Sequence, residues 1–392
     1  MNKAIRDVSL YVHFPYCKMR CTYCDFNTYV VDDIPNQTYS DAIVQEGDLR
    51  APTYGPSRLT SIYFGGGTPS LWGPVAIQRL ITRAKQWFTE TSESLEITLE
   101  CNPEEATIER LSQYAETGVT RLSLGFQSLQ DSVLQTIGRR HSAERAREAV
   151  KAAMSVEFQT VSVDLMFGLP GQSTQTWTND LKEIANTGIP HLSLYHLTLE
   201  PGTAMTRDVR NQLLSLPSEE NQDEMWDIVH PACEAFGLLP YEISNLAKPG
   251  HESHHNISYW LGTPYLGLGA GAHSFKPPGN WALENAHAVR SMGMKKPQRY
   301  MSQLLSGDAT PEWQEDIDPM THLRERMFTG LRHLPGFNMD VVAADLAMKP
   351  TEIFADELRS LSQEKLVVID QNWIRLTAQG LRLANDVFLR FF

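Results

Sequence analysis

Strand-like and helix-like segments alternate six times over the first 200 residues. The strand-like segments are apolar and are found at 10–14, 59–64, 95–100, 121–126, 160–166 and 191–197. Each is followed by a longer polar or amphipathic stretch that is typical of a helix. Parallel strands need long crossover connections, so this order predicts a parallel sheet covered by helices. Six units favour a partial (β/α)6 TIM-like barrel over a closed eight-stranded one.

Polar residues gather at the ends of these strands. They include Gly65–Thr68, Glu100, Gln127, Asp164 and Tyr195. In barrel-like α/β folds the carboxyl ends of the strands carry the active site, so we expect these residues to meet there. Glu100 points to the opposite side from Leu95, Ile97 and Leu99. Asp164 lies in an apolar run and needs a partner, because burying a lone carboxylate is costly.

Three cysteines follow the first strand within eight residues. Cys17, Cys21 and Cys24 have the spacing C-x3-C-x2-C. A structural zinc site usually takes four protein ligands, whereas three thiolates on a [4Fe–4S] cluster leave one iron open to another ligand. The pattern favours the cluster over a disulfide, a zinc site with a distant fourth ligand, or core cysteines. Cys101 and Cys233 lie in apolar settings and are interpreted as core residues.

The pattern changes after the sixth strand. We expect three parts, with boundaries at 1–215, 216–296 and 297–392. The middle part contains 241–275, which is rich in His, Gly and aromatic residues and poor in helical periodicity. The last part has helical segments and a short hairpin at 366–369 and 373–376, followed by a helix at 377–392. Helices with a small hairpin resemble a winged-helix-like module in an α+β C-terminal extension.

A second candidate site lies in the middle part. His251, His254 and His255 fall within five residues, and Asn256, Tyr259 and Trp260 follow. Imidazole is an axial ligand of haem iron, and aromatic rings pack on a porphyrin face. The alternative is a polar loop that binds nothing.

Composition limits the partners. The formal net charge is −13 and the pI is about 5.4, which argues against nucleic acid as the main partner. There is neither a signal-peptide pattern nor an apolar run of the ~18 residues that a membrane span requires. We therefore expect a cytoplasmic protein, with peripheral association at the inner face of the membrane left open.

Several motifs together resemble one known family. They are YVHFPYC from Tyr11, CTYCDF from Cys21, GGGTPS from Gly65, ECNP from Glu100, RLSLGFQS from Arg121, VDLMFGLPGQ from Val163, YEISNLAKPG from Tyr241 and HNISYW from His255. This set is similar to the haem chaperones of the radical S-adenosylmethionine (SAM) superfamily, which are relatives of the oxygen-independent coproporphyrinogen III oxidases. The oxidases carry a further cysteine at the position of Phe26, and the chaperones do not.

The resemblance implies cofactors and their ligands. Cys17, Cys21 and Cys24 would hold a [4Fe–4S] cluster. SAM would contact Tyr11, Gly66, Thr68, Glu100, Gln127, Arg139 and Asp164. Haem would be bound by His255, Asn256, Tyr259 and Trp260, with His254 and His251 as competing imidazoles.

The resemblance also implies a function. The protein would bind haem and pass it to acceptor haemoproteins, respiratory ones being expected, under control of the cluster and SAM. One alternative is an enzyme that decarboxylates the propionates of coproporphyrinogen III. Another is a haem-storage protein whose cluster is structural. Whether the chain is an enzyme stays open at this point.

Overall fold

A computed structural model describes residues 5–392. Its main feature is a 12-stranded sheet in the order β14-β13-β12-β11-β1-β4-β5-β6-β7-β8-β10-β9. The six predicted strands are confirmed, and they are adjacent and parallel in chain order. They are β1 (Arg6–Phe14), β4 (Ser57–Gly66), β5 (Glu90–Cys101), β6 (Arg121–Gln127), β7 (Thr160–Phe167) and β8 (His191–His196). The predicted partial barrel is therefore present.

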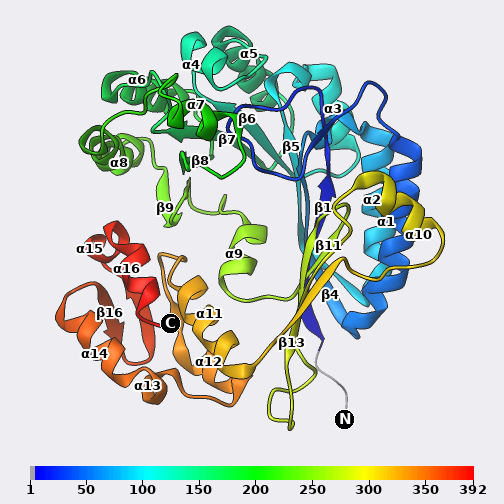
Figure 1. The fold of residues 1–392 in the computed structure, drawn as a ribbon, viewed down its shortest axis with the longest axis vertical. Coiled ribbons are helices and arrows are strands. Elements are labelled where there is room, and N and C mark those ends of the chain that lie inside the picture. Colours follow the sequence, from blue (N-terminus) through cyan, green and yellow to red (C-terminus); the bar gives the residue numbers. More distant parts are fainter. Residues whose placement is uncertain (1–4) are drawn as a thin grey trace.

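Helices cover the outer face of these strands (Figure 1). They are α1 (Asn36–Arg50), α2 (Pro74–Trp87), α3 (Ile108–Glu116), α4 (Asp131–Thr136), α5 (Ala143–Met154), α6 (Thr174–Asn186), α8 (Glu219–Glu234) and α10 (Pro297–Leu305). A short α7 (Ala204–Arg210) follows β8. Alternate strand residues such as Leu10, Ile62 and Leu99 are fully or almost fully buried in the core that lies between the sheet and these helices. The residues between them face inward and are mostly polar, so the inside of the barrel is lined by hydrogen-bonding groups.

Both edges of the parallel sheet are extended by strands from residues 239–317. On one edge β10 (Asn245–Ala247) pairs antiparallel with β8, and β9 (Leu239–Glu242) pairs with β10 as the outermost strand. On the other edge β11 (Tyr265–Leu268) pairs parallel with β1, joining Ser9 to Tyr265. Beyond it lie β12 (His273–Lys276), β13 (Ala288–Met292) and β14 (Trp313–Ile317). Strands from the region expected as a middle extension are thus part of the main sheet.

One helix joins the two edges. The helix α9 (His254–Trp260) lies between β10 and β11 in the chain, and Figure 1 shows it in the hollow of the curved sheet. Its side chains bond to inward-facing residues such as Ser9 and Ser61. No helical periodicity marks this stretch, because its seven residues make only about two turns, too few for a periodic pattern.

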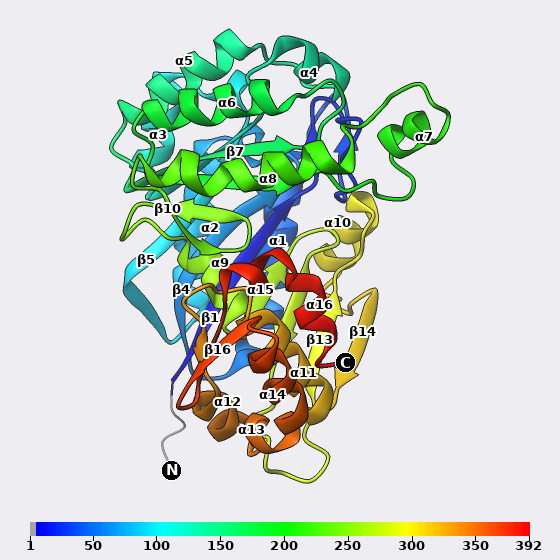
Figure 2. The same cartoon turned by 90° about the vertical axis from the view of Figure 1, so that its left-hand side faces the viewer.

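The C-terminal module has its own core and a small sheet (Figure 2). Its helices are α11 (Pro319–Gly330), α12 (Met339–Leu346), α13 (Pro350–Ile353), α14 (Ala355–Gln363), α15 (Ala378–Arg382) and α16 (Ala384–Leu389). The predicted hairpin is confirmed as β16 (Val367–Asp370) and β17 (Trp373–Leu376), and β15 (Phe337–Asn338) pairs with β17. The single helix predicted at 377–392 is instead two helices, which are separated at Leu383.

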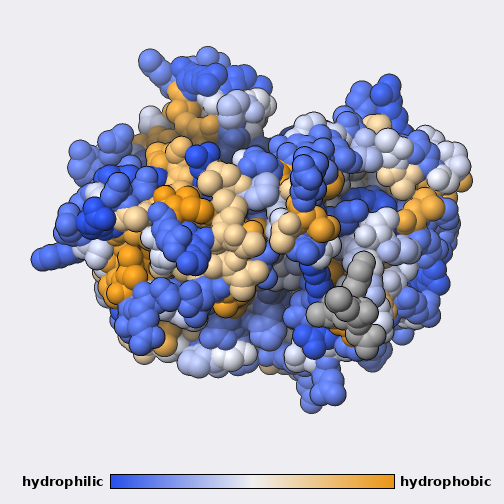
Figure 3. Space-filling model, turned by 90° about the horizontal axis from the view of Figure 1, so that it is seen from below, coloured by the Kyte–Doolittle hydropathy of each residue, from blue (hydrophilic) through white to orange (hydrophobic). Residues whose placement is uncertain are grey.

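The surface of this module carries apolar side chains. Val341, Leu389 and Phe392 are each more than half exposed. Seen from below, orange hydrophobic residues lie among blue hydrophilic ones over the left-hand lobe, where the module lies (Figure 3). Across residues 5–392, no helix combines the length and the apolar character that a bilayer crossing requires.

Candidate functional site

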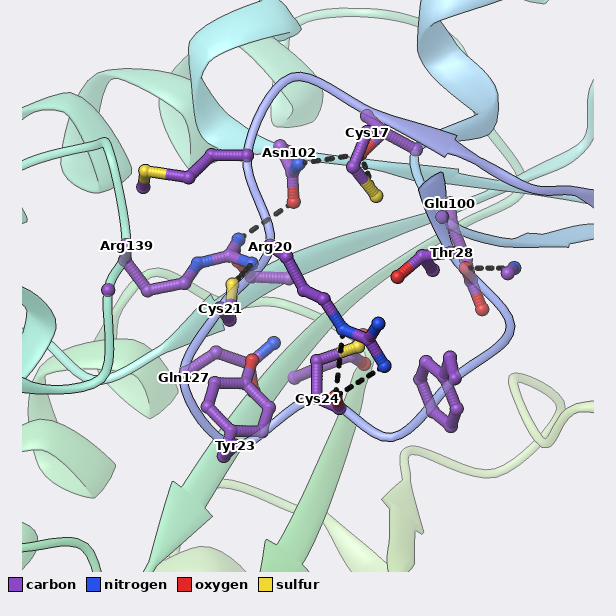
Figure 4. Close-up of a pocket in the computed structure, with 18 of the residues that line it drawn as sticks. Cys17, Arg20, Cys21, Tyr23, Cys24, Thr28, Glu100, Asn102, Gln127 and Arg139 are labelled. Carbon is purple, nitrogen blue, oxygen red and sulfur yellow. Dashed lines mark hydrogen bonds between the residues drawn. The ribbon is translucent and has the colours of Figure 1, made fainter. Parts of the chain in front are cut away.

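The cysteine loop forms one wall of a cavity of about 350 Å³ at the carboxyl ends of the parallel strands. Its two ends are held together where β2 (Tyr16–Cys17) pairs with β3 (Tyr29–Val30). Figure 4 shows the three cysteines of the loop facing the same space. The same cavity is lined by Gly66, Thr68, Glu100, Gln127, Arg139 and Asp164. The structure therefore brings together six of the seven residues that were predicted to contact SAM.

Tyr11 is the exception, because it does not line the cavity. It lies on β1 with its ring centroid 6.1 Å from that of Tyr63, which does line it. The Tyr11 hydroxyl bonds to His13 Nδ1 at 3.0 Å. Tyr11 is therefore placed behind Tyr63, one layer below the cavity.

The glycine run, Gly65–Gly67, lets the end of β4 lie close to the cysteine loop. A Cβ on Gly67 would lie 2.6 Å from the Tyr16 carbonyl oxygen and 3.0 Å from Cys17 Sγ. Only glycine fits at such a distance. The Gly67 amide donates to Phe14 O at 2.7 Å and the Thr68 amide to Tyr16 O at 2.9 Å. The run thus fixes the start of the cysteine loop as well as forming the cavity wall.

A chain of hydrogen bonds connects two of the cysteines. The partly buried Arg139 guanidinium donates to Cys21 Sγ at 3.6 Å, to Asn102 Oδ1 at 2.7 Å and to the Gly125 carbonyl. Asn102 donates to Thr68 Oγ1 at 3.1 Å, and Thr68 donates to Cys17 Sγ at 3.6 Å. The chain of bonds therefore holds Cys21 and Cys17 in fixed positions at the cavity.

The chemistry of the three loop cysteines suits an iron–sulfur cluster. All three cysteines are free, and no three His, Cys, Asp or Glu side chains within residues 5–392 are grouped closely enough to hold one metal ion. In a [4Fe–4S] cluster each thiolate binds a different iron, so the sulfurs surround a space instead of a point. Burial raises the pKa of Cys17 to about 11 and also raises that of Cys24. Binding iron there must release protons.

Two partly buried carboxylates face the cavity from β5 and β7, which flank β6 in the sheet. Glu100 accepts hydrogen bonds from the Tyr63 hydroxyl at 2.9 Å and from the Gly66 amide at 3.0 Å. Asp164 accepts from Ser123 Oγ at 3.0 Å. Burial raises the pKa of Glu100 to about 7, and burial also raises the pKa of Asp164. A cationic ligand would restore the charged form of both groups.

Gln127 is held in an unusual backbone conformation. Its φ is 72°, and the register of β6 with β7 shifts between Gly125 and Gln127. A residue other than glycine in this region costs of order 1–3 kcal/mol, and such residues concentrate at functional sites. The bulge ends the strand and directs this position toward the cavity.

The predicted haem residues lie elsewhere, on α9. His255 is 1% exposed, and its ring nitrogens bond to Ser61 Oγ at 2.8 Å and to the Tyr259 hydroxyl at 3.1 Å. Ligation of haem iron by His255 would therefore require α9 to leave its place. His254 is exposed, and Asn256 is partly exposed. The Trp260 ring faces the C-terminal module, with the guanidinium carbon of Arg332 4.6 Å from its centroid.

Sequence reasoning missed three residues that shape these sites. Asn102 and Tyr63 contact the predicted ligands directly, and Glu96 holds the start of α9. A signal was present for two of them. Asn102 follows Glu100 in the ECNP motif, and Glu96 shares a strand face with Glu100.

Comparison with known proteins places the chain in a family. Residues 11–184 match the radical SAM superfamily, and residues 317–383 match the HemN C-terminal domain. The heme chaperone HemW of Bacillus subtilis is 32% identical over 98% of this chain and 98% of its own length. A mitochondrial radical S-adenosyl methionine domain-containing protein 1 from Mus musculus is 33% identical over 97% of this chain and 86% of its own.

Among solved structures, coproporphyrinogen III oxidase (HemN) from Escherichia coli has a similar fold. The TM-score is 0.81 and the identity 22%, covering 100% of this chain and 91% of that one. This likeness concerns the fold alone. The sequence relationship runs from end to end, and on that basis the chain belongs to the HemW family of the radical SAM superfamily.

Proposed function

We propose that this protein binds haem and transfers it to acceptor haemoproteins. The observation that carries the proposal is the end-to-end similarity to proteins named heme chaperone HemW. A second feature agrees with it. Phe26 is 62% exposed at the rim of the cavity, at the position where the oxidases resembled by this sequence carry a further cysteine.

The cavity would hold a [4Fe–4S] cluster and SAM. Cys17, Cys21 and Cys24 would be the cluster ligands, and bound SAM would fill the coordination of the iron that has no cysteine ligand. Glu100 and Asp164 would face the positive charges and hydroxyl groups of SAM, because carboxylates accept strong hydrogen bonds from such donors. The cluster would supply one-electron redox chemistry at this position.

The affinity for SAM is expected to depend on pH. The ionised Glu100 carboxylate attracts a cation, and the protonated form does not. Because burial raises the pKa of Glu100 to about 7, affinity should rise as pH increases through 7 and fall as pH decreases. Calorimetric titration of the reconstituted protein with SAM between about pH 6 and pH 8.5 measures this. A flat profile would show that Glu100 does not face the ligand's charge.

Haem would bind along the segment that contains α9. The exposed His254 offers an imidazole without any change in the helix, whereas His255 offers one only after α9 moves. Asn256, Tyr259 and Trp260 would add polar and aromatic contacts, as the family motif implies.

Transfer of haem is tested directly. Haem-loaded protein is mixed with an apo-peroxidase under anaerobic conditions, and the Soret band and peroxidase activity are followed. We expect the acceptor to gain activity. Replacing both His254 and His255 by Ala should shift the Soret band of the donor or weaken haem binding. Oxidation of coproporphyrinogen III by the wild type, or an unaltered haem titration in the double variant, would contradict this proposal.

A further inference from the structure

The helix α9 starts on a buried carboxylate of the barrel. Glu96, on β5, is only 9% exposed. It accepts hydrogen bonds from Ser253 Oγ at 3.2 Å, the His254 amide at 3.0 Å and the His255 amide at 2.9 Å. The first amides of a helix have no partner within it, and a carboxylate there is favourable. The start of α9 is thereby fixed to the inner face of the sheet.

His255 is enclosed between α9 and the strands. Besides its bonds to Ser61 and Tyr259, its ring lies 4.9 Å from the Tyr63 ring, at an interplanar angle of 31°. One turn further along, Ser258 Oγ bonds to Ser9 Oγ on β1 at 2.7 Å. His255, the first residue of the HNISYW motif, therefore holds α9 against the inside of the barrel.

Tyr63 contacts His255 with its ring and the cavity with its hydroxyl. The hydroxyl donates to Glu100 Oε1 at 2.9 Å. A Cβ on Gly65 would lie 2.8 Å from the Tyr63 ring and 3.0 Å from Glu100 Oε1. The tyrosine and the carboxylate are thus packed closely against the glycine run. A single aromatic ring separates His255 from the carboxylate that faces the proposed SAM site.

We propose that His255 is a positioning residue for the SAM site, acting through Tyr63 on Glu100. The inference rests on the proposed SAM site. By packing on Tyr63, His255 holds the hydroxyl in line with the carboxylate, and any displacement of α9 releases that constraint. Because coupling between two binding events is reciprocal, SAM in the cavity favours the docked α9, and a ligand that displaces α9 weakens SAM binding.

The test measures SAM affinity calorimetrically on anaerobically reconstituted protein. His255→Ala should weaken SAM binding by about tenfold, the effect of losing one hydrogen bond to a charged group. His255→Phe keeps a ring against Tyr63 and should retain more of the affinity. The control is His287→Ala, which removes an exposed imidazole outside the cavity. SAM affinity should be unchanged in that variant. The paramagnetic signal of the cluster should respond less to SAM in His255→Ala.

A double-mutant cycle separates positioning from a general loss of structure. Tyr63→Phe removes only the hydroxyl that bonds to Glu100, so its effect should not add to that of His255→Ala. Additive losses, or unchanged SAM affinity in both variants, would overturn the inference while leaving the proposed function intact. Failure of the wild type to bind SAM would instead overturn the proposed function. If His255→Ala does not retain the cluster, His255→Phe and Tyr63→Phe complete the cycle.

Discussion

Replacing Cys24 by Ala is expected to leave the protein without its cluster. The same result is expected for Cys17 and Cys21, since each of the three loop thiolates would bind its own iron. Two thiolates cannot hold three irons, and the carboxylates that also line the cavity suit harder cations. Iron and acid-labile sulfide should fall to background after anaerobic reconstitution, and the SAM-dependent paramagnetic signal should disappear.

Cys101 and Cys233 provide matched controls in the same chain. Both are buried, with 3% and 0% of their surface exposed. Burial raises the pKa of each to about 12, and neither belongs to the cysteine loop. Cys101→Ala and Cys233→Ala should therefore keep the full iron content, at the cost of some stability from the lost packing. A complete cluster in Cys24→Ala would show that the three-cysteine assignment is wrong.

Glu100→Gln should produce the second large effect, on SAM. Glutamine keeps the shape of the side chain but carries no charge, so it cannot pair with a cation. Losing a hydrogen bond to a charged group costs about 1.5–3 kcal/mol, equivalent to roughly ten- to hundredfold in affinity. Calorimetry should show this loss, together with little change in the melting temperature, because the Gly66 amide can still donate to the amide oxygen and the Tyr63 hydroxyl can turn to accept from the amide NH2 group.

The control for this change is Glu116→Gln. Glu116 is exposed on α3, outside the cavity, and its replacement removes the same charge from the chain. SAM affinity should be unchanged in that variant. Equal affinities in the wild type and Glu100→Gln would mean that Glu100 supports the fold and does not contact the ligand.

The barrel and its cavity could be predicted because their signals are local. The parallel strands carry apolar residues at alternate positions, and residues such as Gly65 and Glu100 stand at their carboxyl ends. Once the strands are parallel, their ends must meet at one face, so residues such as Glu100, Gln127 and Asp164 are expected to lie together there. Contact with SAM was implied by the family resemblance, and the structure brings six of those seven residues to one cavity.

The rest depends on contacts between distant residues. The strands β10 and β11 have three and four residues, and they form only because β8 and β1 offer free edges. Likewise, nothing in the neighbourhood of Tyr63 indicates that its ring lies between His255 and Glu100. The histidine motif predicted a haem ligand, and its sequence does not indicate that burial lowers the pKa of His255 to about 3 and keeps the ring neutral inside the barrel.

The pairing of Ser9 with Tyr265 has a consequence for synthesis of the chain. The edge of β1 that receives β11 stays unpaired until the ribosome has passed Tyr265, although the other edge can pair with β4 early. An open edge next to a cysteine loop is exposed to aggregation, and long-range pairing is slow. Closure by β11 and docking of α9 are therefore late folding events, and the cysteine loop stays open to cluster assembly for most of translation.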